Sequence, residues 1–166
     1  MNIMENLSVQ HKTAGFVIHV RWMIRRDMPT VLAIEESSPE PHWTTEDEFL
    51  FRLRQRTCVG MVAEVGADVV GFMIYEIHKD RLGLLKFVVH SRYRRSWIGR
   101  AMMSMLFVKL SPSTRNRIVL EVRETNLAAQ LFFRSMGFRA IRIIKGEVDS
   151  YLMQYRCESL ANLPSE

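Results

Sequence analysis

Two groups of residues in this 166-residue chain have the types and spacing that chemistry needs. The first is a set of arginines around the stretch RRSWIGRA: Arg92, Arg94, Arg95 and Arg100. Arginine binds phosphate through a planar fork of donors, and a loop that runs straight into a helix directs free N–H groups at an anion. The second is Glu121, which interrupts the apolar run of residues 118–122. We expect an anion site at the first group, and at Glu121 either acid–base chemistry or an ion pair with an arginine such as Arg123.

The overall charge leaves the nature of the anion open. The net charge is +5, and eighteen of the 23 basic residues are arginines. A small phosphorylated cofactor, a nucleic acid, a ribosomal surface or a solvated basic face would each account for this. The glycine-rich motifs GxxxxGK[ST] and GxGxxG are absent from the sequence. Nucleic-acid binding is disfavoured, because the chain lacks interleaved aromatic residues and a recognition helix.

Composition predicts a globular, cytoplasmic protein. Hydrophobic residues make up 48% and charged residues 25% of the chain, which suits one domain with a substantial core. No apolar run approaches the roughly 18 residues that span a bilayer, and the first residues lack the apolar segment of a signal peptide. Cys58 and Cys157 fit neither a disulfide framework nor a metal motif, so we expect no metal. We expect a flexible arm over residues 1–15, a single domain over 16–157 and a tail over 158–166.

Hydrophobic periodicity predicts the elements that position the two groups. The expected strands are 16–24, 58–65, 69–78, 82–90, 117–122 and a final pair within 138–156, and the expected helices are 27–36, 44–55, 98–110 and 126–136. Asp27 is a candidate N-cap, Thr45 and Glu48 have capping-box spacing, and Gly137 suits a helix end. The order β-α-α-β-β-β-α-β-α-β-β predicts an α/β fold, in which a mixed sheet has helices on both faces.

The anion loop resembles a known family signature. RRSWIGRA is similar to the R/Q-x-x-G-x-G/A motif of the GNAT (Gcn5-related) N-acetyltransferases, with Arg94 first, Gly99 as the second glycine and Ala101 after it. The segments LEVRETNLAAQLFFRSMGF (120–138) and IRRDMPTVLAIEE also resemble that family, so the likeness covers roughly residues 18–155. It implies a mostly antiparallel sheet of six to seven strands. It also implies an acyltransferase that moves an acetyl group from acetyl-CoA to a primary amine.

The resemblance implies which residues hold coenzyme A. They come from the end of one strand, from the loop and from a later helix: Phe87, Val88, Val89, Arg94, Arg95, Ser96, Trp97, Ile98, Gly99, Arg100, Ala101, Asn126 and Phe133. A backbone N–H near Val88 or Val89 is expected to meet the oxyanion. Asn126 is also explained as a helix N-cap, and both roles can coexist.

The LEVR segment, followed by Asn126 and by the Gly-Phe pair, is typical of the subfamily that acetylates protein N-termini, above all the bacterial ribosomal-protein alanine acetyltransferases. The glutamate of LEVR serves there as the base, which implies this role for Glu121. The stretch PHWT (41–44) resembles the subfamily's substrate loop, which implies that Trp43 binds substrate. The implied acceptor is a protein or peptide α-amine. A small-molecule amine acceptor and a non-catalytic acyl-CoA-binding module are alternatives that the sequence leaves open. It also leaves open whether the chain forms a homodimer.

Two residues depart from the family pattern. Trp97 stands where the signature has its first glycine; with φ > 0 it would be strained by about 1–3 kcal/mol, whereas φ < 0 in the first helical turn would be tolerated. We expect the second conformation. Phe133 replaces the family's general-acid tyrosine, so we expect slower chemistry, with water or a tyrosine such as Tyr151 assisting. The short turn 145–147 also replaces a tyrosine-rich segment.

Overall fold

The fold was obtained as a computed structural model, which describes residues 9–13, 15–38 and 45–157. Contacts within the chain form two compact units. We call residues 1–75 and 86–105 unit 1, and residues 76–85 and 106–166 unit 2. The sequence predicts a single domain over 16–157. The division between the units falls inside two strands, β4 (Asp68–Ile77) and β5 (Arg81–Val89), and inside helix α3 (Ile98–Phe107), and not in a linker.

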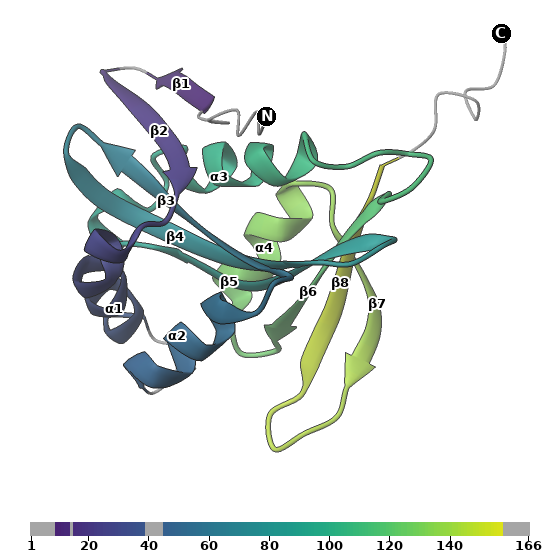
Figure 1. The fold of residues 1–166 in the computed structure, drawn as a ribbon. Coiled ribbons are helices and arrows are strands. Elements are labelled where there is room, and N and C mark those ends of the chain that lie inside the picture. Colours follow the sequence, from purple (N-terminus) through teal and green to yellow (C-terminus); the bar gives the residue numbers. More distant parts are fainter. Residues whose placement is uncertain (1–8, 14, 39–44, 158–166) are drawn as a thin grey trace, which may run out of the picture. The chain divides into compact units, whose positions relative to one another are not determined.

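Eight strands pair in the order β1-β2-β3-β4-β5-β6-β8-β7 (Figure 1). Besides β4 and β5 they are β1 (Val9–Thr13), β2 (Phe16–Trp22), β3 (Cys58–Val65), β6 (Arg117–Arg123), β7 (Arg139–Ile144) and β8 (Ser150–Arg156). β5 and β6 run parallel, whereas the pairs β1–β2, β2–β3, β6–β8 and β7–β8 are antiparallel. The predicted mixed, mostly antiparallel sheet is therefore confirmed.

The strand count exceeds the expected six to seven because of β1. The prediction of a flexible arm over residues 1–15 is wrong for Val9–Thr13, where all five residues pair with β2. The sequence of β1, VQHKT, lacks the apolar alternation by which a strand is recognised. Its strand conformation depends on backbone pairing with β2, which a pattern of side chains does not report.

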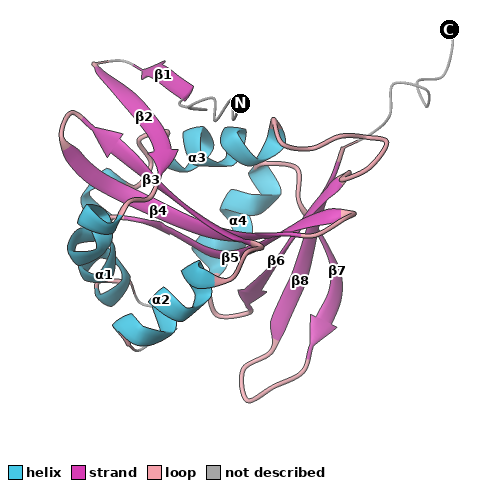
Figure 2. Cartoon of the chain, in the orientation of Figure 1, coloured by secondary structure: helices cyan, strands magenta, loops and turns pink. Residues whose placement is uncertain are grey.

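The expected helices are present, although their boundaries differ by up to three residues (Figure 2). They are α1 (Met28–Glu36), α2 (Glu46–Arg54), α3 (Ile98–Phe107) and α4 (Leu127–Ser135), with short 3-10 turns η1 (Arg25–Asp27) and η2 (Ser91–Tyr93). The Thr45 hydroxyl accepts the Glu48 N–H at 3.2 Å, and Gly137 takes a φ of 92°, as predicted. None of the described helices is long and apolar enough to cross a membrane.

Asp27 stands at the predicted N-cap position of α1, but its side chain makes no capping hydrogen bond to that helix, because its carboxylate makes other bonds in unit 1. It accepts the Ile24 N–H at 2.8 Å and two hydrogen bonds from the Arg21 guanidinium at 2.7 and 2.8 Å. Arg21 also donates to Glu64 of β3 at 2.5 Å. These bonds lower the pKa values of Asp27 and Glu64 and raise that of Arg21. The network therefore joins β2, β3 and the start of α1.

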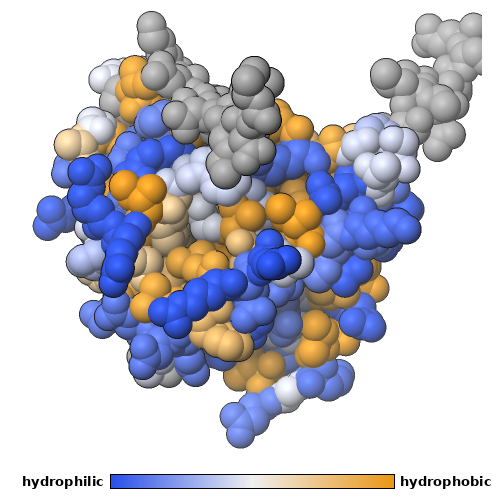
Figure 3. Space-filling view, viewed as in Figure 1, coloured by the Kyte–Doolittle hydropathy of each residue, from blue (hydrophilic) through white to orange (hydrophobic). Residues whose placement is uncertain are grey.

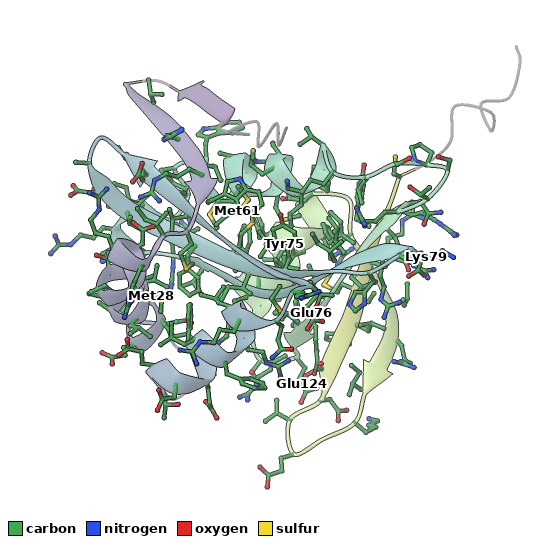
Figure 4. All side chains as sticks on the ribbon, in the orientation of Figure 1. Met28, Met61, Tyr75, Glu76, Lys79 and Glu124 are labelled. Atoms are coloured by element: carbon green, nitrogen blue, oxygen red, sulfur yellow. The ribbon has the colours of Figure 1, made fainter. Side chains whose placement is uncertain are left out.

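A second ion pair lies inside the apolar core of unit 1. Lys86 of β5 donates from Nζ to Oε1 of Glu35 on α1, and the two side chains are only 4% and 7% exposed. Glu35 Oε2 has no hydrogen-bond partner among the described residues. Met61 and Tyr75, labelled in Figure 4, belong to the surrounding core. The pair links α1 to β5 directly before Phe87, the first residue expected to contact the cofactor.

The three strands β6, β8 and β7 give unit 2 two different faces. On one face Ile118, Leu120, Val122 and Met153 are at most 5% exposed. Aromatic rings cover this face: Tyr155 lies 4.5 Å from Phe107 and 5.7 Å from Phe138, and Phe138 lies 5.4 Å from Phe133 of α4. We call it the covered face. Because side chains alternate along a strand, Val119, Glu121 and Arg123 point to the opposite side, which we call the open face.

Candidate active site

The predicted anion loop lies in unit 1, between β5 and α3. After β5 the chain makes the turn η2, in which the Tyr93 N–H donates to the His90 carbonyl at 2.9 Å and Arg94 donates from Nε to the Val89 carbonyl at 3.3 Å. The Ser96 hydroxyl donates to the Tyr93 carbonyl. The Arg94 bond holds the loop against the end of β5, and the other two bonds are internal to residues 90–96.

Free backbone donors gather at the start of α3. The first helical bond runs from the Ala101 N–H to the Trp97 carbonyl at 2.9 Å. The N–H groups of Ile98 and Gly99 precede that bond, so the helix geometry leaves them without a carbonyl one turn earlier. The positive end of the helix dipole adds to their attraction for an anion. Together with the loop arginines, these donors match the charge and hydrogen-bonding needs of a pyrophosphate.

The expected conformation of Trp97 is wrong. Its φ is 69°, in the left-handed region, and that of Arg95 is 63°. Trp97 therefore precedes the first residue of α3 and does not occupy the first helical turn. Left-handed residues in a loop turn successive N–H groups to one side, which forms a concave site for an anion. Two residues with side chains thus adopt a backbone conformation that favours glycine, at the cost of strain.

The Trp97 ring lies on the surface of the loop. It is 61% exposed, and the Arg100 guanidinium sits 5.4 Å from the ring centroid. A guanidinium over an indole face is attracted to the ring. The contact holds Trp97 beside a residue that the sequence assigns to the phosphate site, and it gives a compensating interaction for the strained backbone.

Glu121 lies in unit 2, on the open face of β6. Its side chain is exposed, while its neighbours Leu120 and Val122 point into the covered face and are buried. Glu121 pairs in register with Leu152 of β8. The interruption of the apolar run is thus explained by strand alternation, and it leaves a carboxylate accessible to solvent on a rigid strand.

The two α4 residues of the predicted site take different positions. Asn126 is the N-cap of α4, where its Oδ1 accepts the Ala129 N–H at 3.0 Å, so its predicted capping role is confirmed. Phe133 is 6% exposed and packs against Phe132 and Phe138, with centroids 5.2 and 5.4 Å apart. Tyr151 pairs with Val122 and therefore points to the covered face, the side on which Phe133 lies and opposite to Glu121.

The predicted site residues fall into two groups, one in each unit. Unit 1 brings together the end of β5 (residues 87–89) and the loop (residues 94–101), and unit 2 contains Glu121, Asn126 and Phe133. Trp43 lies outside the described residues. No cluster of metal-ligating side chains occurs among the residues that the structure describes.

The sequence alone does not reveal that arginines of β7 and β8 share a face of the sheet with Glu121. Their positions follow from the register of β6, β8 and β7, which brings together residues up to 39 positions apart. The pattern RIVLEVR of β6 shows that Arg117, Glu121 and Arg123 share a face. The contributions of β7 and β8 could be found only after the strands had been paired.

Comparison with known proteins identifies the family. The model of the acetyltransferase (GNAT) family matches residues 21–138. The chain belongs to the GNAT acetyltransferase family. It is therefore an acetyltransferase, and acetyl-CoA is the acetyl donor that this family uses.

Individual relatives agree with this assignment. The chain is 27% identical over 117 residues to the ribosomal protein bS18-alanine N-acetyltransferase of Escherichia coli K12. The match covers 70% of this chain and 78% of that protein. The crystal structure of the Escherichia coli ribosomal-protein-S18-alanine N-acetyltransferase has a TM-score of 0.76 at 23% identity and covers 88% of this chain and 98% of that one. Naa50 of Arabidopsis thaliana, solved with the bisubstrate analogue CoA-Ac-MVNAL, has a TM-score of 0.67 at 17% identity, with coverages of 83% and 97%. The last two likenesses concern the fold.

Proposed function

We propose that this GNAT acetyltransferase acetylates the α-amine of a protein or peptide N-terminus and that Glu121 is its general base. The observation that carries the proposal is the exposed carboxylate of Glu121, presented by a strand whose flanking side chains are buried. The named activity of the Escherichia coli relative, which acts on a ribosomal-protein alanine, supports the same acceptor class.

The base has one proton to remove before the amine can attack. A protein α-amine has an ordinary pKa of about 7.7–8.0, so a substantial fraction is ammonium at neutral pH and must lose one proton before attack. Acetyl-CoA supplies the thioester carbon that the amine nitrogen attacks. Glu121 takes this proton from the ammonium, directly or through one water, before the attack. The nitrogen gives its second proton to water once the new C–N bond has formed. The C–S bond then breaks, and the electron pair leaves with the sulfur.

Phe133 cannot protonate that sulfur, because its ring carries no hydroxyl. The ordinary pKa of a thiol is about 8.5, so a thiolate can leave at neutral pH without a strong acid. Tyr151 lies on the same face of unit 2 as Phe133. Tyr151 therefore lies on the opposite side of β8 from Glu121, and we assign the proton that the leaving sulfur takes up to water. Slower turnover than in relatives with a tyrosine at this position is expected.

The test compares wild type with Glu121→Gln and with Glu124→Gln as a matched control. Glu124, labelled in Figure 4, is exposed just beyond β6 and has no role in the proposed chemistry. CoA release from acetyl-CoA would be followed from pH 6 to pH 9 with peptides that have a free N-terminus, with polyamines and with aminoglycosides. Glu121→Gln is expected to lower kcat/KM on peptides by about 10²- to 10⁴-fold, and Glu124→Gln to leave it within about twofold.

Three results would contradict the proposal. Unchanged turnover in Glu121→Gln would exclude this carboxylate as the base. Turnover of polyamines or aminoglycosides without turnover of peptides would move the enzyme to small-molecule acceptors. Binding of acetyl-CoA without turnover of any amine would indicate a binding module.

A further inference from the structure

The open face of unit 2 carries a set of arginines whose positions follow from strand pairing. Residues that pair in register place their side chains on the same face of a sheet. Arg81 of β5 pairs with Arg117 of β6, which pairs in turn with Arg156 of β8. One row of the open face therefore consists of three arginines.

The row of Glu121 ends at another arginine. Glu121 pairs with Leu152, and Leu152 pairs with Arg142 of β7. Between these two rows Gln154 pairs with Arg139. Ile141 is the extra residue of a β-bulge, so Arg139 and Arg142 share the open face although they are three positions apart in sequence.

Among the described residues, carboxylates pair with basic side chains on one side of this face. Asp80 forms ion pairs with both Arg81 and Arg117, and Glu76, labelled in Figure 4, lies 3.4 Å from His78. A Cβ built on Gly83 would lie within 4 Å of Glu76 and His78, which places both on the open face near β5. The β5 side of the face therefore carries its own counterions.

In the part of the chain that the structure describes, the side towards β7 has no such counterions. Arg139, Arg142 and Arg156 are exposed, and none of them forms an ion pair with another residue of the described part of the chain. Glu121 is the acidic residue that shares their rows. Positive charge thus accumulates beside the proposed base and increases towards the edge strand.

The distances suit a short extended peptide. Neighbouring strands lie about 4.8 Å apart, so the backbone positions of Glu121 and Arg142 are separated by roughly 10 Å across β8. An extended chain covers this distance in about three residues, at 3.2–3.4 Å each. An acceptor with its amine at Glu121 that continues towards β7 would place its second to fourth side chains over Leu152, Arg139 and Arg142.

We propose that the acceptor of this enzyme is an acidic N-terminus, with Asp or Glu within its second to fourth residues, and that Arg139 and Arg142 bind these carboxylates. The inference rests on the proposed function, because Glu121 locates the amine. An acceptor with lysines or arginines at these positions would meet like charges and is disfavoured. A nucleic acid is a different ligand for the same arginines, and the test includes it.

The experiment uses three eight-residue peptides that differ only at positions two and three: Ala-Asp-Asp, Ala-Asn-Asn and Ala-Lys-Lys, each followed by the same neutral sequence. Initial rates give kcat/KM for wild type, for the double variant Arg139→Glu/Arg142→Glu, and for Arg134→Glu. Arg134 is an exposed arginine of α4, the helix on the covered face, and serves as the matched control. A twelve-nucleotide RNA is tested in parallel for binding to each protein.

Wild type is expected to favour the Asp peptide over the Asn peptide by about three- to tenfold, and the Lys peptide is expected to rank last. The double variant should reverse the order of the Asp and Lys peptides, each rate being taken relative to that on the Asn peptide. Arg134→Glu should keep the wild-type order. Raising the salt concentration to about 0.5 M should shrink the preference, because exposed charges are screened.

Equal kcat/KM for the three peptides in wild type would overturn the acidic-acceptor inference and leave the proposed function standing. RNA binding that requires Arg139 and Arg142, with no effect of peptide charge on acetylation, would overturn it in favour of a nucleic-acid surface. Acetylation of small amines but of none of the peptides would overturn both the inference and the proposed function.

Discussion

At the scale of single residues, Trp97 takes a left-handed backbone conformation that glycine adopts most readily. The sequence predicts the anion loop and its donors, but it gives no information on the sign of φ at Trp97. That sign follows from how the loop joins η2 to α3. Glu121, by contrast, could be singled out in advance, because a charged residue within an apolar strand is uncommon unless it faces solvent or a partner.

Replacing Trp97 tests whether the loop is strained. Trp97→Gly and Trp97→Ala both remove the ring and its contact with Arg100, but only glycine lacks the Cβ that clashes at φ 69°. We expect Trp97→Gly to have a free energy of unfolding about 1 kcal/mol higher than Trp97→Ala, measured by urea denaturation. Equal stabilities of the two variants would mean that the left-handed conformation costs nothing at this position.

At the scale of elements, hydrophobic periodicity predicts the helices and strands that have a pattern of their own. It misses features that depend on residues elsewhere in the chain. All four helices and seven of the eight strands are predicted because each has a hydrophobic pattern of its own. β1 and the bonds of Asp27 are missed, since both depend on residues elsewhere in the chain. The same limit hides Arg139 and Arg142, which come beside Glu121 only through β8. Figure 3 shows hydrophilic and hydrophobic residues mixed over the visible surface. The composition of the chain does not predict where each kind lies.

The Arg21 network predicts a pH dependence of stability in unit 1. Asp27 and Glu64 have pKa values below their ordinary 3.8 and 4.5, so their ion pairs stabilise the fold above pH 4.5. This contribution is lost as the pH falls through the lowered values of the folded state. Arg21→Met should lower the free energy of unfolding by about 3 kcal/mol at pH 7, because it leaves the buried Asp27 without its cation.

The difference between wild type and Arg21→Met should therefore shrink when urea denaturation is repeated at pH 5, 4 and 3. Arg25→Met is the control, as Arg25 is exposed and belongs to the same turn. A difference that stays constant down to pH 3 would show that the network does not depend on ionised carboxylates.

At the scale of the whole molecule, membership of the acetyltransferase family defines the reaction but leaves the acceptor open. Acetyltransferases differ in which amine they acetylate. The exposed position of Glu121 and the charge of the open face concern this choice directly. The arginines of the anion loop point to coenzyme A, and the arginines of the open face are the basis for proposing an acidic acceptor.

The site of acetylation tests the central claim most directly. A peptide with a free α-amine, aspartates at positions two and three and a lysine near its other end offers both kinds of amine to the enzyme. After incubation with acetyl-CoA, fragmentation in a mass spectrometer locates the added acetyl group. We predict that it lies on the α-amine and that Glu121→Gln removes it. Acetylation of the lysine side chain, with the α-amine untouched, would contradict the claim.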